Sequence, residues 1–353
     1  MSSDVGAPPP LAGGTRDPCQ DYTPRGHASR YNNDCYAGMR DDTARTEAYR
    51  RAIEEAAAGR VVVDLGTGAL ALLAIFAARA GAEHVYAIEV QSAAAASARR
   101  TITEAGLADK VTVLDGFSTD EAVVLPIKAE LMVHELIGEI AGEEGAVAAV
   151  ADALRRHMDP AALPPLSVPA RVCTLLAPAE YPDAAYCAGV PSTLLAAAGS
   201  ALKLPALPRS ALLAPPQTCE DLRFESGRPE ASQRHELRFV AARAGALRGL
   251  ALHIEIHCGR NGADAEPDVS SAWAGSHWNT ILLLLAGEVR VEAGQAIVVH
   301  TTAELAGVQP RYTFEAWLLA AGGARRSLGP PIGYPEAALN CNEMADLLLA
   351  EET

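Results

Sequence analysis

Short apolar runs and longer alanine-rich runs alternate through the first half of the chain. Four runs rich in Val, Ile and Leu are typical of strands buried on both faces, and they cover residues 61–66, 84–90, 111–116 and 129–135. Runs of helical length and spacing lie before, between and after them, at residues 31–57, 70–80, 92–106 and 146–158. Strands that alternate with helices predict right-handed βαβ units and a mostly parallel sheet.

The pattern changes at a proline-rich connection over residues 159–170. Short runs between Gly, Pro and polar turns then predict an antiparallel sheet or barrel, and they cover residues 171–179, 235–242, 250–258, 280–287, 289–302 and 311–321. An apolar insertion over 180–218 interrupts them, and we expect it to cover a partner surface because so apolar a segment rarely stays exposed. We therefore predict a flexible tail over 1–28, a first domain over 29–160 and a second over 161–353.

Composition and charge narrow the classes of function. The 353 residues include 44 acidic and 29 basic side chains, a formal net charge of −15, which argues against general nucleic-acid binding and is compatible with a cationic substrate. No uncharged stretch approaches the length of a membrane span, and the N-terminus lacks the order of a secretory signal. The seven cysteines are scattered without a C-x-x-C pair, which favours reduced thiols and a cytoplasmic location.

A glycine-rich turn, Asp64-Leu65-Gly66-Thr67-Gly68, follows the first predicted strand and opens a helix. Glycines there let the backbone approach a ligand at the carboxyl end of the sheet, and Glu89, at the end of the second strand, can accept both hydroxyls of a ribose. The third glycine of a dinucleotide-binding turn is absent, with Ala69-Leu70 in its place, so S-adenosylmethionine is favoured over a nicotinamide cofactor. The turn resembles motif I of class I methyltransferases. Gly116-Phe117-Ser118, after the third strand, is expected beside the adenine.

The fourth predicted strand leads into a loop with four glutamates in ten residues, the outer two being Glu135 and Glu144. Carboxylates so close together repel one another unless a cation balances them. Gly138 and Gly142 let the chain fold back, so that the outer carboxylates can face each other across a hairpin. A planar guanidinium offers paired N–H donors to carboxylates on two sides. An isolated acidic run is more often a solvated loop, but its place beside a nucleoside-binding sheet edge favours a guanidinium site.

Three separated motifs resemble those of the protein arginine methyltransferases. The loop from Glu135 to Glu144 resembles their double-E hairpin, although His134 stands where the family usually has Ser. Residues 39–50 resemble their M-x-x-D-x-x-R-T-x-x-Y-R helix, and Ser276-His277-Trp278 resembles their T-H-W loop. The three motifs follow the family's order over roughly residues 30–310.

The resemblance implies a fold, a cofactor and a set of roles. The fold is a Rossmann-like class I methyltransferase domain followed by an antiparallel β-barrel domain, in a homodimer for which 180–218 is the candidate dimerisation arm. The cofactor is S-adenosylmethionine, with no metal, and its expected contacts are Arg45, Asp64, Gly66, Gly68 and Glu89. Glu135 and Glu144 would orient the guanidinium, and His277 would take up the released proton. The expected lining of the substrate pocket is Tyr31, Met39, His134 and Trp278.

We therefore expect methyl transfer to a guanidino nitrogen of arginine. The alanine-rich composition suggests a GC-rich bacterial gene, which slightly favours free L-arginine or a small guanidino metabolite in biosynthesis over peptidyl arginine. Two further hypotheses stay open. One is a methyltransferase fold kept as a non-catalytic binding module, and the other is methyl transfer to a different nitrogen or to oxygen.

Overall fold

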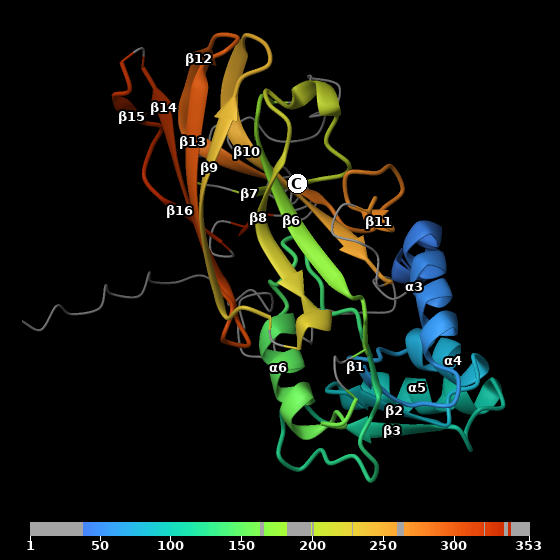
Figure 1. The fold of residues 1–353 in the computed structure, drawn as a ribbon. Coiled ribbons are helices and arrows are strands. Elements are labelled where there is room, and N and C mark those ends of the chain that lie inside the picture. The colour runs from blue at the N-terminus through green and yellow to red at the C-terminus, as the bar shows by residue number, and fades with distance from the viewer. Residues whose placement is uncertain are drawn as a thin grey trace, which may run out of the picture.

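The structure is a computed structural model that describes residues 38–162, 166–181, 199, 201–227, 229–259, 265–320, 322–334 and 338–339. A parallel α/β unit lies at one end of the molecule, and two largely antiparallel sheets extend away from it (Figure 1). The predicted order of a Rossmann-like part followed by an antiparallel part is confirmed. The predicted tail over residues 1–28 lies outside the described residues.

Five parallel strands form the first sheet, in the order β3-β2-β1-β4-β5. They are β1 (Val61–Leu65), β2 (His84–Glu89), β3 (Val111–Asp115), β4 (Leu131–His134) and β5 (Leu166–Val168). Every residue of β1 and β4 is buried, as their apolar composition predicts for central strands. The chain crosses from one side of β1 to the other between β3 and β4. In such sheets a ligand crevice opens beyond the carboxyl ends of the strands at this reversal.

Four helices accompany this sheet, and each lies within a run that the sequence predicted as helical. They are α3 (Thr43–Ala56), α4 (Leu72–Arg79), α5 (Ser92–Glu104) and α6 (Ala146–Arg156), and residues 38–41 form a further helical turn. Helix α4 packs on β1 and β2, and α5 packs on β2 and β3. Asp42 caps α3, because its side chain accepts a hydrogen bond from the backbone N of Arg45. This cap determines where the helix that carries Arg45 begins.

The proline-rich connection contains a strand that the sequence did not predict. Residues 166–168 form β5, which pairs in parallel with β4. A three-residue strand between prolines carries little pattern of its own, and its place in the sheet comes from pairing with β4. The parallel sheet therefore extends past residue 160, where the change of pattern suggested a domain boundary.

Two sheets make up the rest of the described chain, in the orders β17-β7-β12-β10-β6-β8 and β15-β14-β13-β9, with β11 beside β10 and β16 beside β14. Burial alternates along β14, because one face packs on the core and the other faces outward. Apolar residues from these sheets and from the parallel sheet, among them Val63, Leu252 and Phe314, belong to one continuous core. The two parts of the chain are thus packed together rather than tethered.

The strands of these sheets are β6 (Arg171–Ala179), β7 (Ala201–Leu204), β8 (Gln217–Arg223), β9 (Ser232–Val240), β10 (Gly245–His257), β11 (Val269–Ser270), β12 (Thr280–Val291), β13 (Ala296–Glu304), β14 (Arg311–Leu319), β15 (Arg325–Ser327), β16 (Ile332–Tyr334) and β17 (Ala338–Leu339). Two short 3₁₀ helices, η2 (Arg209–Ala211) and η3 (Phe224–Ser226), flank β8. Four of the six strand runs predicted in this half each correspond to one strand, namely β6, β9, β10 and β14. The other two differ in their bounds, because β12 continues through 291 and a turn divides the run predicted over 289–302 before β13 begins.

The apolar insertion over 180–218 is partly built into these sheets. Strand β7 pairs with β12, and Leu202 and Leu204 are buried in a small apolar cluster with Leu282 and Leu284. The described part of the insertion therefore covers its own chain, which corrects the expectation that the whole segment covers a partner. Residues 182–198 lie outside the described residues.

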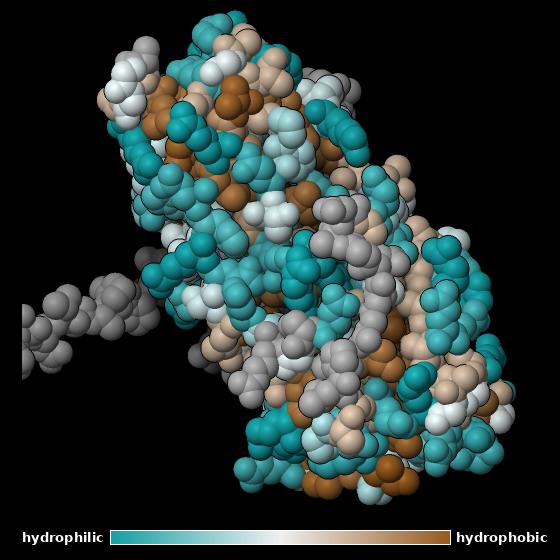
Figure 2. Space-filling view, viewed as in Figure 1, coloured by the Kyte–Doolittle hydropathy of each residue, from teal (hydrophilic) through white to brown (hydrophobic). Residues whose placement is uncertain are grey.

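Hydrophobic residues make up 49% of the sequence, and many of them are buried in the core. The face seen in Figure 2 is mainly hydrophilic, with apolar side chains scattered over it. The large apolar side chains that are exposed in the described chain include Val124 and Val308. None of the described helices is both long enough and apolar enough to span a membrane.

Candidate active site

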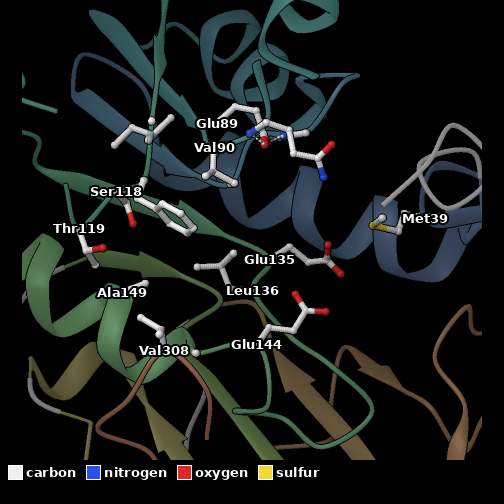
Figure 3. A pocket seen from close by; sticks show the side chains of 17 residues that line it. Met39, Glu89, Val90, Ser118, Thr119, Glu135, Leu136, Glu144, Ala149 and Val308 are labelled. Atoms are coloured by element: carbon white, nitrogen blue, oxygen red, sulfur yellow. Dashed lines mark hydrogen bonds between the residues drawn. The ribbon is translucent and has the colours of Figure 1, made fainter. Parts of the chain in front are cut away.

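A cavity opens beyond the carboxyl ends of β1, β2 and β4, where the strand order reverses. It contains about 990 Å³ of empty space, including the part open to solvent. Its wall is formed by the glycine turn after β1, the end of β2, the turn after β3 and the hairpin over residues 135–144. The site residues predicted from sequence that line it are Met39, Gly66, Gly68, Glu89, Gly116, Phe117, Ser118, Glu135 and Glu144 (Figure 3).

The glycine turn brings backbone to the edge of the cavity. Gly66 and Gly68 have φ values of 75° and 67°, a left-handed conformation that side chains disfavour. A Cβ on Gly66 would lie 2.9 Å from Cδ2 of Leu136, so that side chain would have to move to admit it. Asp64 is fully buried beneath the turn, where it accepts a hydrogen bond from the hydroxyl of Thr67 at 2.6 Å. Asp64 is not among the described lining residues, and it supports the turn.

Glu89 ends β2 with its carboxylate at the cavity. Its two oxygens accept hydrogen bonds from the backbone N of Gly68 at 2.9 Å and of Gln91 at 2.8 Å. Each carboxylate oxygen has a second lone pair, so both can still accept a ligand hydroxyl. Burial raises the pKa of Glu89 above its usual value, and the backbone donors oppose this rise. Gly116, with φ 146°, starts the neighbouring turn and donates its N–H to the carbonyl of Glu89.

The hairpin after β4 carries the two carboxylates that the sequence singled out. Figure 3 shows the side chains of Glu135 and Glu144 projecting into the same part of the cavity. Glu135 forms an ion pair with Arg45, whose Nη2 lies 2.9 Å from its Oε2. Burial works to raise the pKa of Glu135, but Arg45 and His277 outweigh it and hold the pKa below its usual value. Glu135 is therefore ionised at neutral pH.

His277 reaches this carboxylate from the second half of the chain. Its Nδ1 lies 2.9 Å from Oδ2 of Asp42, and its Nε2 lies 3.6 Å from Oε1 of Glu135. Burial works to lower the pKa of His277, but the two carboxylates outweigh it and raise the pKa above 6.5. His277 is not among the described lining residues and meets the cavity through Glu135. Asp42 belongs to the predicted helix motif, but its contact with a residue 235 positions away had no local signal.

Trp278 was expected to line the substrate pocket, but it takes another position. It is 5% exposed, and its indole N–H donates to the carbonyl oxygen of Ile137 at 2.8 Å. Its ring lies against that of His277, with centroids 3.8 Å apart. Trp278 therefore fixes the backbone of the hairpin and the ring of His277, and it is not among the described lining residues.

His134 does not line the pocket, which corrects the expectation. Its side chain is completely buried, and its ring packs edge-on against Phe224 with centroids 4.6 Å apart. Successive residues at the end of a strand point to opposite faces, so Glu135 turns into the cavity while His134 turns away. Burial lowers the pKa of His134 to about 4, so the ring is neutral. Tyr31, the fourth residue expected in the pocket, lies outside the described residues.

Two contributions to the site were not predicted. The β13–β14 loop brings Val308, and helix α6 brings Ala149, to the wall of the cavity. Glu139, between the two hairpin carboxylates, pairs with Lys203 of β7 at 3.1 Å and accepts a hydrogen bond from Asn279 at 3.3 Å. Val308, Ala149 and Lys203 come close to the hairpin only through three-dimensional packing, since none of them belongs to a motif that the sequence revealed.

Relatives in sequence are methyltransferases. Residues 46–143 match the family of the ribosomal protein L11 methyltransferase (PrmA). A probable protein arginine N-methyltransferase 6 of Arabidopsis thaliana is 34% identical over 169 residues, which cover 47% of this chain and 37% of that protein. A probable histone-arginine methyltransferase 1.3 of the same plant is 40% identical over 126 residues, which cover 35% of this chain and 23% of that protein. The chain thus spans less than half the length of these curated relatives.

Solved structures with a similar fold cover most of the chain. The structure of Arabidopsis thaliana protein arginine methyltransferase 10, described as uniquely open, has a TM-score of 0.72 at 18% identity and covers 87% of this chain and 98% of its own. A Trypanosoma brucei PRMT1 enzyme-prozyme heterotetrameric complex with AdoHcy has a TM-score of 0.68 at 18% identity and covers 86% and 98%. Such likeness shows the fold. Together with the relatives in sequence, it confirms the resemblance to the protein arginine methyltransferases that the motifs indicated.

Proposed function

We propose that this protein transfers a methyl group from S-adenosylmethionine to a guanidino nitrogen of arginine. The observation that carries the proposal is the meeting of two sets of residues at one cavity. Gly66, Gly68 and Glu89 offer a nucleoside-binding edge, and Glu135 and Glu144 offer two carboxylates beside it. The names of the relatives in sequence and in fold support the same activity.

The cavity wall suits S-adenosylmethionine, which supplies a methyl group on a positively charged sulfur when it is bound. Gly66 lines the cavity with backbone alone, and Glu89 keeps lone pairs for ribose hydroxyls. Phe117 and Ser118 lie where the adenine is expected. Arg45 lines the adjoining part of the cavity and offers a cation for the amino-acid carboxylate.

Glu135 and Glu144 would hold the substrate guanidinium and orient the nitrogen to be methylated. A guanidinium is charged and delocalised at neutral pH, so its nitrogens are weak nucleophiles. Paired hydrogen bonds to two carboxylates draw positive charge toward the nitrogens that do not react. Most of the rate would come from positioning and preorganised charge.

The proton released from the methylated nitrogen would move toward His277. The Nε2 of His277 faces Glu135, and Asp42 holds the opposite nitrogen, so the ring has a fixed orientation. The two carboxylates also favour the protonated ring. Asp42 and Glu135 thus support His277 as the acceptor.

The substrate is either peptidyl or free arginine. The relatives in sequence are protein arginine and histone-arginine methyltransferases, which favours peptidyl arginine over the free amino acid that composition slightly favoured. Incubation of the chain with S-adenosylmethionine and either an arginine–glycine-rich peptide or free L-arginine separates the two, with methylarginine measured by mass spectrometry. Methylation of the peptide alone excludes the free-arginine version, and methylation of free arginine alone excludes the peptide version. Cofactor binding without turnover on any guanidine would favour a non-catalytic module.

Glu144→Gln tests the guanidinium clamp in the same assay. We expect turnover to fall at least about 100-fold while the dissociation constant of the cofactor changes less than about twofold. Glu104→Gln, on the exposed end of α5, is the matched control and keeps full activity. Unchanged turnover of Glu144→Gln would defeat the assignment.

We also propose an oligomeric state and a cellular compartment for this protein. The resemblance favours a homodimer with the insertion over 180–218 as the candidate arm, of which residues 182–198 lie outside the described residues. Size-exclusion chromatography with light scattering, with and without these residues, tests this. The scattered cysteines favour a cytoplasmic location.

A further inference from the structure

Glu220 of β8 is a buried carboxyl group beneath the hairpin over residues 135–144. It is 1% exposed, and its two oxygens accept hydrogen bonds from hydroxyl groups of two other strands. The donors are Thr174 of β6, at 2.6 Å, and Tyr312 of β14, at 3.0 Å. Glu220 thus joins three strands of the second half of the chain at one point.

The same point supports the hairpin. The backbone N of Ala141 donates to the hydroxyl of Thr174 at 2.9 Å, and that hydroxyl donates in turn to Glu220. The next residue, Gly142, lies against the carboxylate, and a Cβ there would come within 2.6 Å of Oε1 of Glu220 and 2.9 Å of the hydroxyl of Tyr312. Two consecutive hairpin residues are therefore seated on this group, and Glu144 follows two residues later.

Stability alone does not require a carboxyl group at this buried point. Burial raises the pKa of Glu220 to about 7, against three polar donors: Thr174, Tyr312 and the backbone of Gly142. Well-packed apolar side chains often serve stability as well as or better than buried charges. What a carboxylate adds is directional acceptance of several hydrogen bonds, which fixes the geometry of whatever donates them.

We propose that Glu220 is a positioning residue for methyl transfer. It supports the hairpin through Thr174 and Gly142, a support that we call the seat of the hairpin, and so keeps Glu144 directed toward the substrate. The inference rests on the proposed function. A misplacement of about 1 Å at a reacting group can cost about 100-fold in rate, so loss of this seat should act on turnover. Cofactor binding, at Glu89 and the glycine turn, should be unaffected, because those groups belong to other elements.

The test compares four variants of the full chain. Glu220→Gln and Thr174→Val weaken the seat, Thr174→Ser keeps the hydroxyl group, and Asp221→Asn changes the neighbouring carboxylate, which pairs with Arg171 instead. The measurements are kcat, KM and the cofactor dissociation constant, together with amide hydrogen exchange of the peptide that contains residues 136–146. Thr174→Val replaces a buried side chain with one of the same shape, so it remains informative if Glu220→Gln folds poorly.

We expect kcat to fall about 10- to 100-fold in Glu220→Gln and Thr174→Val, with the cofactor dissociation constant unchanged and faster exchange in the hairpin peptide. Thr174→Ser and Asp221→Asn should resemble the unchanged chain in both readouts. The proposal is overturned if exchange of the hairpin stays unchanged in both weakened variants, or if it accelerates while kcat stays within twofold. If the unchanged chain methylates no guanidine, the proposed function fails, and hairpin exchange alone still decides whether Glu220 seats the hairpin.

Discussion

Nη2 of Arg45 lies 2.9 Å from Oε2 of Glu135, so the helix that precedes the parallel sheet is joined directly to the first carboxylate of the hairpin. Both side chains are almost fully buried, at 5% and 10% exposure. His277 approaches the other oxygen of the same carboxylate, at 3.6 Å. One carboxylate thus links the groups proposed to hold the cofactor, the guanidinium and the proton. A substitution of any one of these three residues should therefore alter the behaviour of the other two.

Arg45→Gln tests the cofactor part of this link. Removing one partner of a buried ion pair leaves the other charge uncompensated, so we expect the free energy of unfolding to fall by about 3 kcal/mol. The pKa of Glu135 should rise, because Arg45 is the strongest influence that lowers it. The cofactor should bind at least about tenfold more weakly, which corresponds to about 1.4 kcal/mol.

Isothermal titration calorimetry and urea denaturation measure the two effects. Arg51→Gln, on the exposed side of α3, is the control and should change neither quantity. Equal cofactor affinity in Arg45→Gln and the unchanged chain would show that Arg45 does not meet the cofactor.

Asp42→Asn tests the proposed proton acceptor through the pH dependence of kcat/KM. His277 must be neutral to accept a proton, so kcat/KM should fall as pH drops through its pKa, which lies above 6.5. Removal of the Asp42 charge lowers that pKa and should move the acidic limb of the profile to lower pH. Asn also caps helices well, so α3 should stay intact. Asp41→Asn, exposed and paired with Arg40, is the control, and an acidic limb that stays in place in Asp42→Asn would contradict the role of His277.

The parallel half of the fold could be predicted from the sequence because each of its elements has a pattern within its own residues. Apolar runs such as residues 61–66 and 84–90 form strands wherever they are buried, and the helices between them have their own spacing. Strand β5 had no such signal, since three residues between prolines become a strand only by pairing with β4. The apolar residues of β7 were misassigned to a partner surface because the sequence does not tell which chain covers them.

The sequence predicted those residues of the candidate site that belong to a motif. The prediction failed where the direction of a side chain, or a contact between residues far apart in the sequence, decides the outcome. Glu135 and Glu144 were found because spacing alone brings them to two ends of one hairpin. His134 follows the alternation of β4 and turns away from Glu135, a point that alternation predicts but the resemblance outweighed. The contact between Asp42 and His277 arises only when α3 packs beside the loop before β12.

Gly66→Ala tests the close approach of the glycine turn to the cofactor. An alanine at φ 75° is strained by about 1 kcal/mol, and its Cβ would also displace Leu136 beside Glu135. Gly59→Ala is a matched control, since Gly59 has φ 70° and nothing within 4 Å of the added Cβ. Both variants should lose about 1 kcal/mol of unfolding free energy, measured in urea. Only Gly66→Ala should bind the cofactor more weakly, by about tenfold or more, and equal affinities in the two variants would rule out the close approach.

Glu220→Gln should also change how stability depends on pH. The pKa of Glu220 is about 7 in the folded chain against an ordinary 4.5, so the folded state binds more protons than the unfolded state between these values. Unfolding free energy should therefore fall as pH rises from 4.5 to 7, by about 3 kcal/mol from this group alone. The buried neighbours Tyr312 and Glu143 are present in both proteins, and so is Asp64, whose pKa burial also raises to about 7.

The difference between the two proteins isolates Glu220. Urea denaturation at a series of pH values should give a flatter profile for Glu220→Gln, with the two curves diverging as pH rises from 4.5 toward 7 and running parallel above it. Parallel curves over the whole range would mean that Glu220 titrates near its ordinary pKa in the folded chain. In that case the seat beneath the hairpin would hold a fully ionised carboxylate at every pH at which the enzyme is assayed, and the rate would not depend on its protonation.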